Sequence, residues 1–130
     1  MRKMALAAAS VAVAGAASLV TTPSASAIPF VDLIVTGGIS CAGPLPGRPE
    51  THSQTDHGYV RNNGNAPALN VWLGFGGGGG EGRPVLNPGE GFPVMRTVPT
   101  WGCPPRQTWV HTSTSTFDVN YQNNAFLAVN

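Results

Sequence analysis

Residues 69–75 read LNVWLGF, in which large apolar side chains alternate with Asn70, Trp72 and Gly74. Successive side chains of a strand point to opposite faces of the sheet, so the alternation places four apolar side chains on one face. This pattern is typical of an antiparallel strand with one face on a core and the other in solvent. We therefore predict a strand whose apolar face lies in the core. The residues on that face are Leu69, Val71, Leu73 and Phe75.

Further strand-like segments lie on both sides of this strand, with turn signals about every 8–12 residues. They comprise residues 31–36, 56–61, 85–86, 92–98, 107–115 and 125–129. No stretch after residue 27 has a helical period without an interrupting Gly or Pro. These features predict an all-β protein, either a sandwich or a barrel, with one domain over residues 28–130.

The connections between these segments carry recognisable turn chemistry. Asn62-Asn63-Gly64-Asn65 predicts a type I′ hairpin, because both central residues of that turn need a positive φ. The run Gly76 to Gly80 predicts a mobile hairpin loop, and Asn87-Pro88-Gly89-Glu90 predicts a turn. Pro93 has no N–H to donate to a neighbouring strand, so it indicates an edge strand or the start of a strand.

The first 27 residues have the composition of a secretory signal peptide. Arg2 and Lys3 precede an apolar, Ala-rich stretch of about 17 residues, and Ala25-Ser26-Ala27 follows as a small-x-small cleavage site. We predict cleavage between Ala27 and Ile28, a secreted extracellular protein, and no membrane insertion after cleavage. A membrane anchor is the alternative, because the apolar stretch reaches the minimum spanning length.

The charge of residues 28–130 excludes one class of partner. This part of the chain has five Arg, no Lys and six Asp and Glu, so its formal charge is close to −1. Nucleic-acid-binding proteins carry a basic patch or stripe, and this composition cannot supply one. We therefore predict no nucleic-acid partner.

Two cysteines, Cys41 and Cys103, lie within the predicted mature chain. An exported protein leaves the reducing cytosol, so we predict that they form a disulfide. The bridge would close a loop of about 62 residues, which contributes about 4 kcal/mol on the chain-entropy model. Two free buried thiols are the alternative.

Several turn motifs resemble one family. Residues 59–68, YVRNNGNAPA, are similar to the V-x-N-x-G-x-x-x-A hairpin of bacterial CARDB modules, the cell-adhesion-related domains. Residues 86–90, LNPGE, resemble their L-x-P-G-E turn. Asn123-Asn124 and Val31-Asp32-Leu33 resemble their terminal Asn-Asn and their opening segment. The resemblance implies an immunoglobulin-like antiparallel β-sandwich of six to eight strands. The Gly76 to Gly80 insertion and the cysteine pair depart from the family pattern.

Two motifs come close to catalytic or phosphate-binding patterns. Residues 38–42, GISCA, approach a nucleophile elbow around Ser40, but an elbow needs a strand followed by a helix in a parallel sheet. Gly74, Gly76 and Gly79 satisfy G-x-G-x-x-G, but a glycine run meets this pattern almost automatically and no helix follows. We therefore predict no catalytic residue and no cofactor.

The acid–base and oxygen-bearing side chains are sparse. The titratable candidates are His52, Asp56, His57 and His111, and we expect the histidines to be neutral exposed or core residues. Asp118, Asn120 and Gln122 place oxygen atoms at every second position, as at the start of a calcium loop. The glycine and the closing glutamate of such a loop are missing, and an Asx-stabilised turn is the alternative. We predict no metal site.

Two tryptophans lie on predicted strands. Trp72 faces away from the apolar side of its strand, so it is either an exposed platform for a sugar or a protein, or it packs under a loop. Trp109 is predicted to lie in the core against the disulfide. The side chains predicted to pack against the apolar face of residues 69–75 are Val94, Trp109 and Phe126.

The third tryptophan lies in residues 100–105, TWGCPP, a proline-stiffened loop at Cys103. Preorganised loops lower the entropy cost of binding. Trp101, Pro104 and an exposed Trp72 are the candidate binding residues. We predict a secreted, non-enzymatic module that binds an unknown protein or polysaccharide ligand at or beyond the cell surface. The alternative is a secreted enzyme inhibitor that acts through loop 100–105.

Overall fold

The computed structural model describes residues 27–48 and 51–130. The predicted leader therefore lies, except for Ala27, outside the described residues. In the part of the chain that the structure describes, no helix is long and apolar enough to span a membrane.

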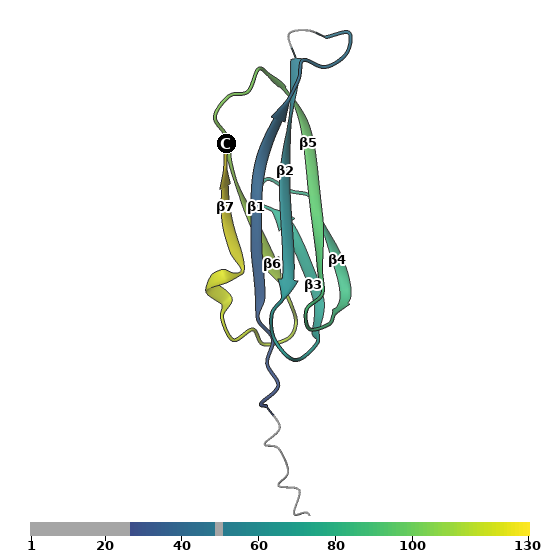
Figure 1. The fold of residues 1–130 in the computed structure, drawn as a ribbon, viewed down its shortest axis with the longest axis vertical. Coiled ribbons are helices and arrows are strands. Elements are labelled where there is room, and N and C mark those ends of the chain that lie inside the picture. Colours follow the sequence, from purple (N-terminus) through teal and green to yellow (C-terminus); the bar gives the residue numbers. More distant parts are fainter. Residues whose placement is uncertain (1–26, 49–50) are drawn as a thin grey trace, which may run out of the picture.

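The chain folds into two antiparallel sheets that lie one in front of the other (Figure 1). The first has the order β1-β2-β5, with bounds Leu33–Ala42, Thr51–Asn62 and Gly91–Trp101. The second has the order β4-β3-β6-β7, with bounds Gly80–Leu86, Ala68–Phe75, Gln107–Ser113 and Ala125–Val129. A short 3-10 helix, η1, spans Tyr121–Asn123. Among the described residues there is no α-helix, and the predicted all-β sandwich of six to eight strands is confirmed with seven strands.

The core lies between the two sheets and contains most of the apolar side chains predicted for it. Val71, Leu73 and Phe75 are buried on the inner face of β3, and Val94 is buried on β5. The other buried apolar residues are Val31, Leu33, Val35, Val60, Ala68, Leu86, Phe92, Val110 and Ala128. Pro93 lies on β5, an edge strand, as predicted.

A pair of glycines fixes which side chain of β6 enters the core. Gly37 on β1 lies opposite Gly58 on β2. A Cβ on either glycine would lie 2.7 Å from a methyl carbon of Val110, so the two glycines leave space for one branched side chain from the opposite sheet. Because side chains alternate along β6, the burial of Val110 places Trp109 outside.

The predicted core positions of Trp109 and Phe126 are therefore wrong. Trp109 lies on the outer face of the second sheet and is exposed. Phe126 pairs with Val110, but it lies on the edge strand β7 and is exposed. The disulfide does not pack against Trp109 either, because it joins the end of β1 to the β5–β6 connection.

The predicted burial of Leu69 is also wrong. Asn70 adopts a positive φ of 52°, a conformation that asparagine tolerates better than most residues. The alternation of inner and outer side chains is interrupted there, so Ala68 is buried and Leu69 is 46% exposed. Val85, the partner of Leu69 on β4, is exposed with it. Strand β4 also begins at Gly80, earlier than the sequence indicates, and ends at Leu86.

The turn at residues 62–65 joins two sheets and is not a hairpin. Strands β2 and β3 belong to different sheets, and neither Asn63 nor Gly64 has a positive φ. The buried Asn62 side chain holds the connection, since its Nδ2 donates to the carbonyl oxygens of Ala66 and Leu86. Its Oδ1 accepts from the Gly64 N–H at 3.0 Å, which is an Asx turn.

The disulfide and the position of one hairpin turn match the sequence predictions. Cys41 and Cys103 form a disulfide with a Cα–Cα distance of 6.0 Å. The glycine run forms the turn of the β3–β4 hairpin, and the turn is hydrogen-bonded through the N–H of Gly76 to Trp109 and the N–H of Gly78 to Phe75. Gly78 and Gly79 have φ values of 98° and 86°, which requires glycine in practice.

Candidate functional site

All three tryptophans are exposed, although tryptophan buries more apolar area than almost any other residue. The exposed fractions are 44% for Trp72, 54% for Trp109 and 74% for Trp101. Exposed large apolar side chains that share one surface indicate an interaction site.

Trp72 and Trp109 share the outer face of the four-stranded sheet, which we call the tryptophan face. Trp72 lies opposite Ser113 in the register of β3 and β6, four residues along β6 from Trp109. At about 3.4 Å per residue, the two indoles are offset by roughly 14 Å along the strands. His111 lies between them on β6, and Leu127 of β7 is paired with Trp109.

Glycines form the surface beneath Trp72. A Cβ at Gly80 would lie 2.6 Å from Trp72 Cζ2, and one at Gly74 would lie 2.7 Å from Trp72 Nε1. A Cβ at Gly82 would lie 3.4 Å from Cε3 on the other side of the ring system. The indole therefore lies flat over the three glycines, with its outer surface in solvent. Next to it is a hollow of about 370 Å³.

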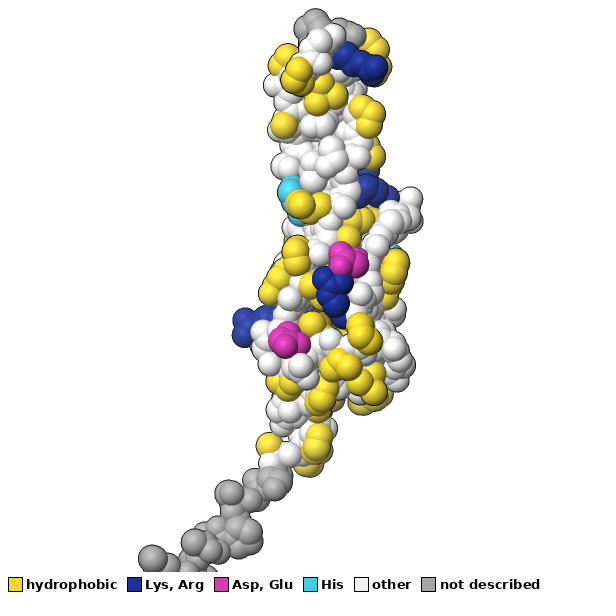
Figure 2. Space-filling view, turned by 90° about the vertical axis from the view of Figure 1, so that its right-hand side faces the viewer, with side chains coloured by type: hydrophobic (Ala, Val, Ile, Leu, Met, Phe, Trp, Pro, Cys, Tyr) yellow, Lys and Arg dark blue, Asp and Glu magenta, His cyan; other side chains and the backbone are white. Residues whose placement is uncertain are grey.

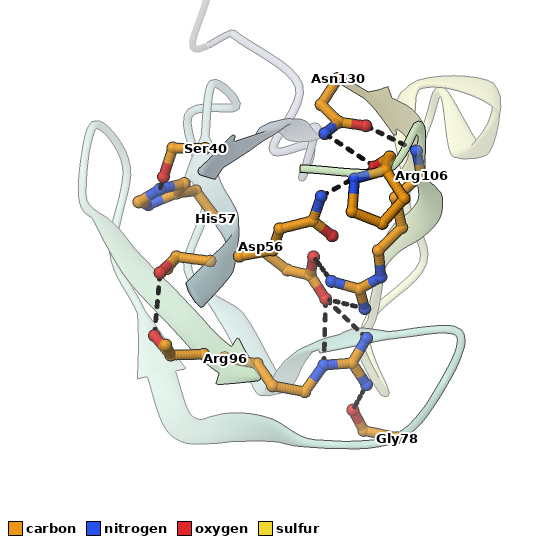
Figure 3. A network of polar contacts seen from close by, with 11 residues as sticks. Ser40, Asp56, His57, Gly78, Arg96, Arg106 and Asn130 are labelled. Carbon is orange, nitrogen blue, oxygen red and sulfur yellow. Dashed lines mark hydrogen bonds and ion pairs between the residues drawn. The ribbon is translucent and has the colours of Figure 1, made fainter. Parts of the chain in front are cut away.

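A buried carboxylate, that of Asp56, lies between the sheets and contacts Arg96 and Arg106 (Figure 3). The Asp56 side chain is fully buried, and it accepts hydrogen bonds from two arginines. Arg96 donates from Nε at 3.0 Å and Nη2 at 2.7 Å, both to Oδ2. Arg106 donates from Nη1 to Oδ1 at 2.8 Å and from Nη2 to Oδ2 at 3.0 Å, in a bidentate pair.

The same arginines contact the glycine turn and the core. Arg96 Nη1 donates to the Gly78 carbonyl oxygen, and its guanidinium lies 5.0 Å from the centre of the Phe75 ring. A Cβ at Gly77 would lie 3.1 Å from Arg96 Nη1, so the glycine run lets the turn approach the guanidinium closely. The Arg96 and Arg106 side chains are 22% and 26% exposed.

A hollow of about 320 Å³ opens beside this cluster, and we call it the arginine pocket. Its lining residues are Gly76, Gly77, Arg96, Arg106, Gln107, Thr108, Trp109 and Leu127. Its lining includes two basic residues together with the apolar residues Trp109 and Leu127. The pocket and the tryptophan face meet at Trp109.

From the sequence, Asp56 was predicted only as an acid–base group, and neither arginine was predicted to be part of a site. A signal was present, because Asp56 shares its strand face with Gly58 and Val60, which point into the core. Arg96 shares its face with Phe92 and Val94 in the same way. Charged residues at inward positions must be paired, so the two could have been matched.

The structure brings together Ser40 and His57, which the sequence left apart. Ser40 Oγ lies 2.7 Å from His57 Nε2 on the outer face of the three-stranded sheet. Asp56 points to the opposite side of β2, as Figure 3 shows, so it cannot orient this imidazole. Ser40 lies within β1, two residues before its end, and no helix follows, so the context of a nucleophile elbow is missing.

The other acid–base candidates do not converge. The Asp118 carboxylate accepts from the Leu33 N–H at 2.9 Å and the Asn120 N–H at 2.8 Å. The second bond is the Asx turn that was the alternative to a calcium loop. His52 and His111 lie on strands of different sheets. Over residues 27–48 and 51–130, no group of three or more His, Cys, Asp or Glu is placed to hold a metal ion.

Residues 100–105 are not all loop as predicted, because Thr100 and Trp101 are the last two residues of β5, in the three-stranded sheet, and only residues 102–105 belong to the connection to β6 (Figure 1). Trp101 borders a hollow of about 360 Å³ with Arg48, Thr51, Pro99 and Thr100. Hydrophobic side chains gather with a basic one at this narrow end of the molecule (Figure 2). Pro104 contributes its carbonyl oxygen to the fold, accepting from Gln54 Nε2 at 2.8 Å.

Comparisons with known proteins identified no relative of this chain. No family model matches the chain, and neither the curated proteins nor the solved structures contain a significant match.

Proposed function

We propose that this protein is a non-enzymatic binding module that takes a polysaccharide chain on the tryptophan face, outside the cell. The observation that carries the proposal is the exposure of Trp72 and Trp109 on one side of one sheet. Neither indole can be buried in this register, since Val71 and Leu73 occupy the inner positions on either side of Trp72 and Val110 occupies the inner position beside Trp109.

The chemistry of the face favours a sugar ligand. The flat surface of an indole stacks on the apolar face of a sugar ring, while the ring hydroxyls remain free for hydrogen bonds. Two such platforms, offset by roughly 14 Å along the strands, suit an extended chain that contacts both. His111 between them, and Asn70 in the hollow beside Trp72, supply polar groups for hydroxyls.

The strand order supports an immunoglobulin-like fold, and the turn motifs that resemble CARDB modules make a module of that type part of this proposal. The first, second and fifth strands form one sheet, and the third, sixth and seventh lie in the other. Constant-type immunoglobulin domains share this division but place the fourth strand in the first sheet. Here β4 pairs with β3, which widens the sheet that carries Trp72. An adhesion-related role at the cell surface agrees with a polysaccharide ligand.

Export is also part of the proposal. The disulfide supports an oxidising compartment, since such bonds are rare in the cytosol. Sequencing of protein recovered from culture medium should give an N-terminus of Ile28-Pro29-Phe30. A membrane-bound form that begins at Met1 would contradict cleavage after Ala27.

The binding site is tested by three matched substitutions and a panel of soluble polysaccharides, both neutral and acidic. We expect Trp72→Ala and Trp109→Ala each to weaken binding about tenfold or more, as truncation of an aromatic anchor does. Trp101→Ala is the control, since it removes an equally large exposed side chain elsewhere. The proposal would be contradicted if Trp72→Ala and Trp109→Ala both bound every polysaccharide that the wild type binds with the affinity of the wild type.

Loop 100–105 supports a second candidate function, inhibition of a secreted enzyme. Trp101 is the most exposed tryptophan, and the adjacent Cys103 is anchored to β1 by the disulfide. A rigid loop with one projecting aromatic side chain suits insertion into an active-site cleft. In this case a panel of secreted hydrolases would contain an enzyme inhibited by the wild type and not by Trp101→Ala.

A further inference from the structure

We propose that the arginine pocket binds a carboxylate, so that the polysaccharide on the tryptophan face is an acidic chain built from uronate sugars. This inference rests on the proposed function, because it assigns the chemical class of the ligand at the same face. The arginine pocket would be a second contact with the ligand, adjacent to Trp109, and it would recognise charge.

The first observation is a charge imbalance. Asp56 is one carboxylate between two guanidinium groups, so the cluster carries a net charge of +1. Among the described residues, no other carboxylate lies within ion-pair distance of Arg96 or Arg106. Both arginines are about three-quarters buried. Because a buried charge is costly without a partner, the surplus cation favours an anion beside it.

The second observation is the number of unused donors. A guanidinium has five N–H groups. Arg96 uses three of them, on Asp56 and Gly78, and Arg106 uses two, both on Asp56. Five N–H groups of the pair therefore remain without a protein acceptor among the described residues. Arg96 and Arg106 both line the arginine pocket, where such donors can meet a ligand.

The third observation is that the two arginines are already held in place. Asp56 fixes both, the Gly78 carbonyl fixes one end of Arg96, and the ring of Phe75 lies against its guanidinium. The Arg106 backbone is also bonded to Asn130 through both its N–H and its carbonyl oxygen. Preorganised groups lose little side-chain entropy on binding, so the cost of ordering has been met by folding.

The shape and charge of the pocket select the ligand. The planar guanidinium fork matches a carboxylate, and a surplus of +1 matches one carboxylate better than a doubly charged phosphate. Trp109 and Leu127, which line the same pocket, suit the apolar face of a ring attached to that carboxylate. A sugar ring with a carboxylate substituent combines both features.

Oligogalacturonate and its methyl ester are the probes, because they differ in the charge of the carboxylate and share the sugar chain. By titration calorimetry, we expect the free acid to bind the wild type at least about tenfold more tightly than the ester. Added salt should weaken binding of the acid more than binding of the ester, because mobile ions screen the charge. This comparison needs no variant, so it does not depend on how a substitution folds.

Substitutions then locate the charge recognition. Arg106→Gln should lose most of the preference for the acid, because it removes the guanidinium with three unused N–H groups. Arg61→Gln, on the exposed outer face of the other sheet, removes the same charge and should leave the preference unchanged.

The outcomes separate this inference from the proposed function. Equal binding of acid and ester that still depends on Trp72 and Trp109 would overturn the carboxylate site and leave the polysaccharide face standing. Binding of a sulfated dextran in place of the uronate would overturn the choice of carboxylate. Failure of both galacturonate probes together with every chain in the neutral and acidic panel would overturn both proposals.

Discussion

Replacing Asp56 with asparagine is expected to lower the free energy of unfolding by about 3 kcal/mol or more. The substitution keeps the shape of the side chain and removes the only carboxylate that faces the two guanidinium groups in the described structure. Removal of one partner of a buried ion pair typically costs about 3–5 kcal/mol, because the remaining charge stays buried without compensation. The lower end applies here, since Arg96 and Arg106 retain some contact with solvent.

Urea unfolding of the purified protein measures this loss as a lower transition midpoint at an unchanged slope. The matched control is Glu81→Gln, which breaks the surface ion pair with Arg83 on β4. We expect it to cost about 0.5 kcal/mol or less, because exposed ion pairs contribute little. Equal losses for Asp56→Asn and Glu81→Gln would show that Asp56 is not the buried centre of the cluster.

A triple substitution, Asp56→Leu, Arg96→Met and Arg106→Met, separates stability from binding. Apolar replacements of a whole buried ion cluster are often neutral or stabilising. We therefore expect this variant to regain most of the stability that Asp56→Asn loses. It should also lose the preference for acidic chains, since no guanidinium remains in the arginine pocket.

Leu73→Ala is expected to destabilise the protein by about 2–5 kcal/mol, as large-to-small changes in a core do. Leu73 is fully buried on β3, and its removal leaves a cavity between the sheets. Leu69→Ala is the matched control, because it makes the same change on the same strand at an exposed position. We expect it to cost less than about 1 kcal/mol.

The comparison of these two leucines tests the register of β3. In thermal unfolding followed by circular dichroism, we expect the midpoint temperature of Leu73→Ala to lie well below that of Leu69→Ala. Equally large losses for the two variants would mean that Leu69 is buried as well and that the interruption at Asn70 is absent. Small losses for both would instead indicate a one-residue shift of the strand, which would turn Trp72 inward and remove it from the tryptophan face.

Local pattern predicted the parts of the fold that depend on local geometry. The alternation in residues 69–75 placed Val71, Leu73 and Phe75 inside, and the missing N–H of Pro93 indicated an edge strand. The conformation of Asn70 was not predictable, because a positive φ is uncommon for any residue except glycine. One such residue was enough to expose Leu69.

The candidate site depended on contacts across the two sheets, and local pattern cannot supply these. The outward position of Trp109 follows from the space that Gly37 and Gly58 leave for Val110, on strands far apart in sequence. The pairing of Asp56 with Arg106 likewise joins residues 50 positions apart. Inward-facing charges in alternating strands indicate that a partner exists, but only the packing of the sheets identifies it.

The indole N–H signals of the three tryptophans, measured in a proton–nitrogen correlation spectrum, test the binding face most directly. Trp→Phe substitutions assign the three signals, and oligogalacturonate is then added to the ¹⁵N-labelled protein. We expect the Trp72 and Trp109 signals to shift with a common affinity and the Trp101 signal to stay in place. A shift confined to Trp101 would place the ligand on loop 100–105 and contradict the proposed polysaccharide face.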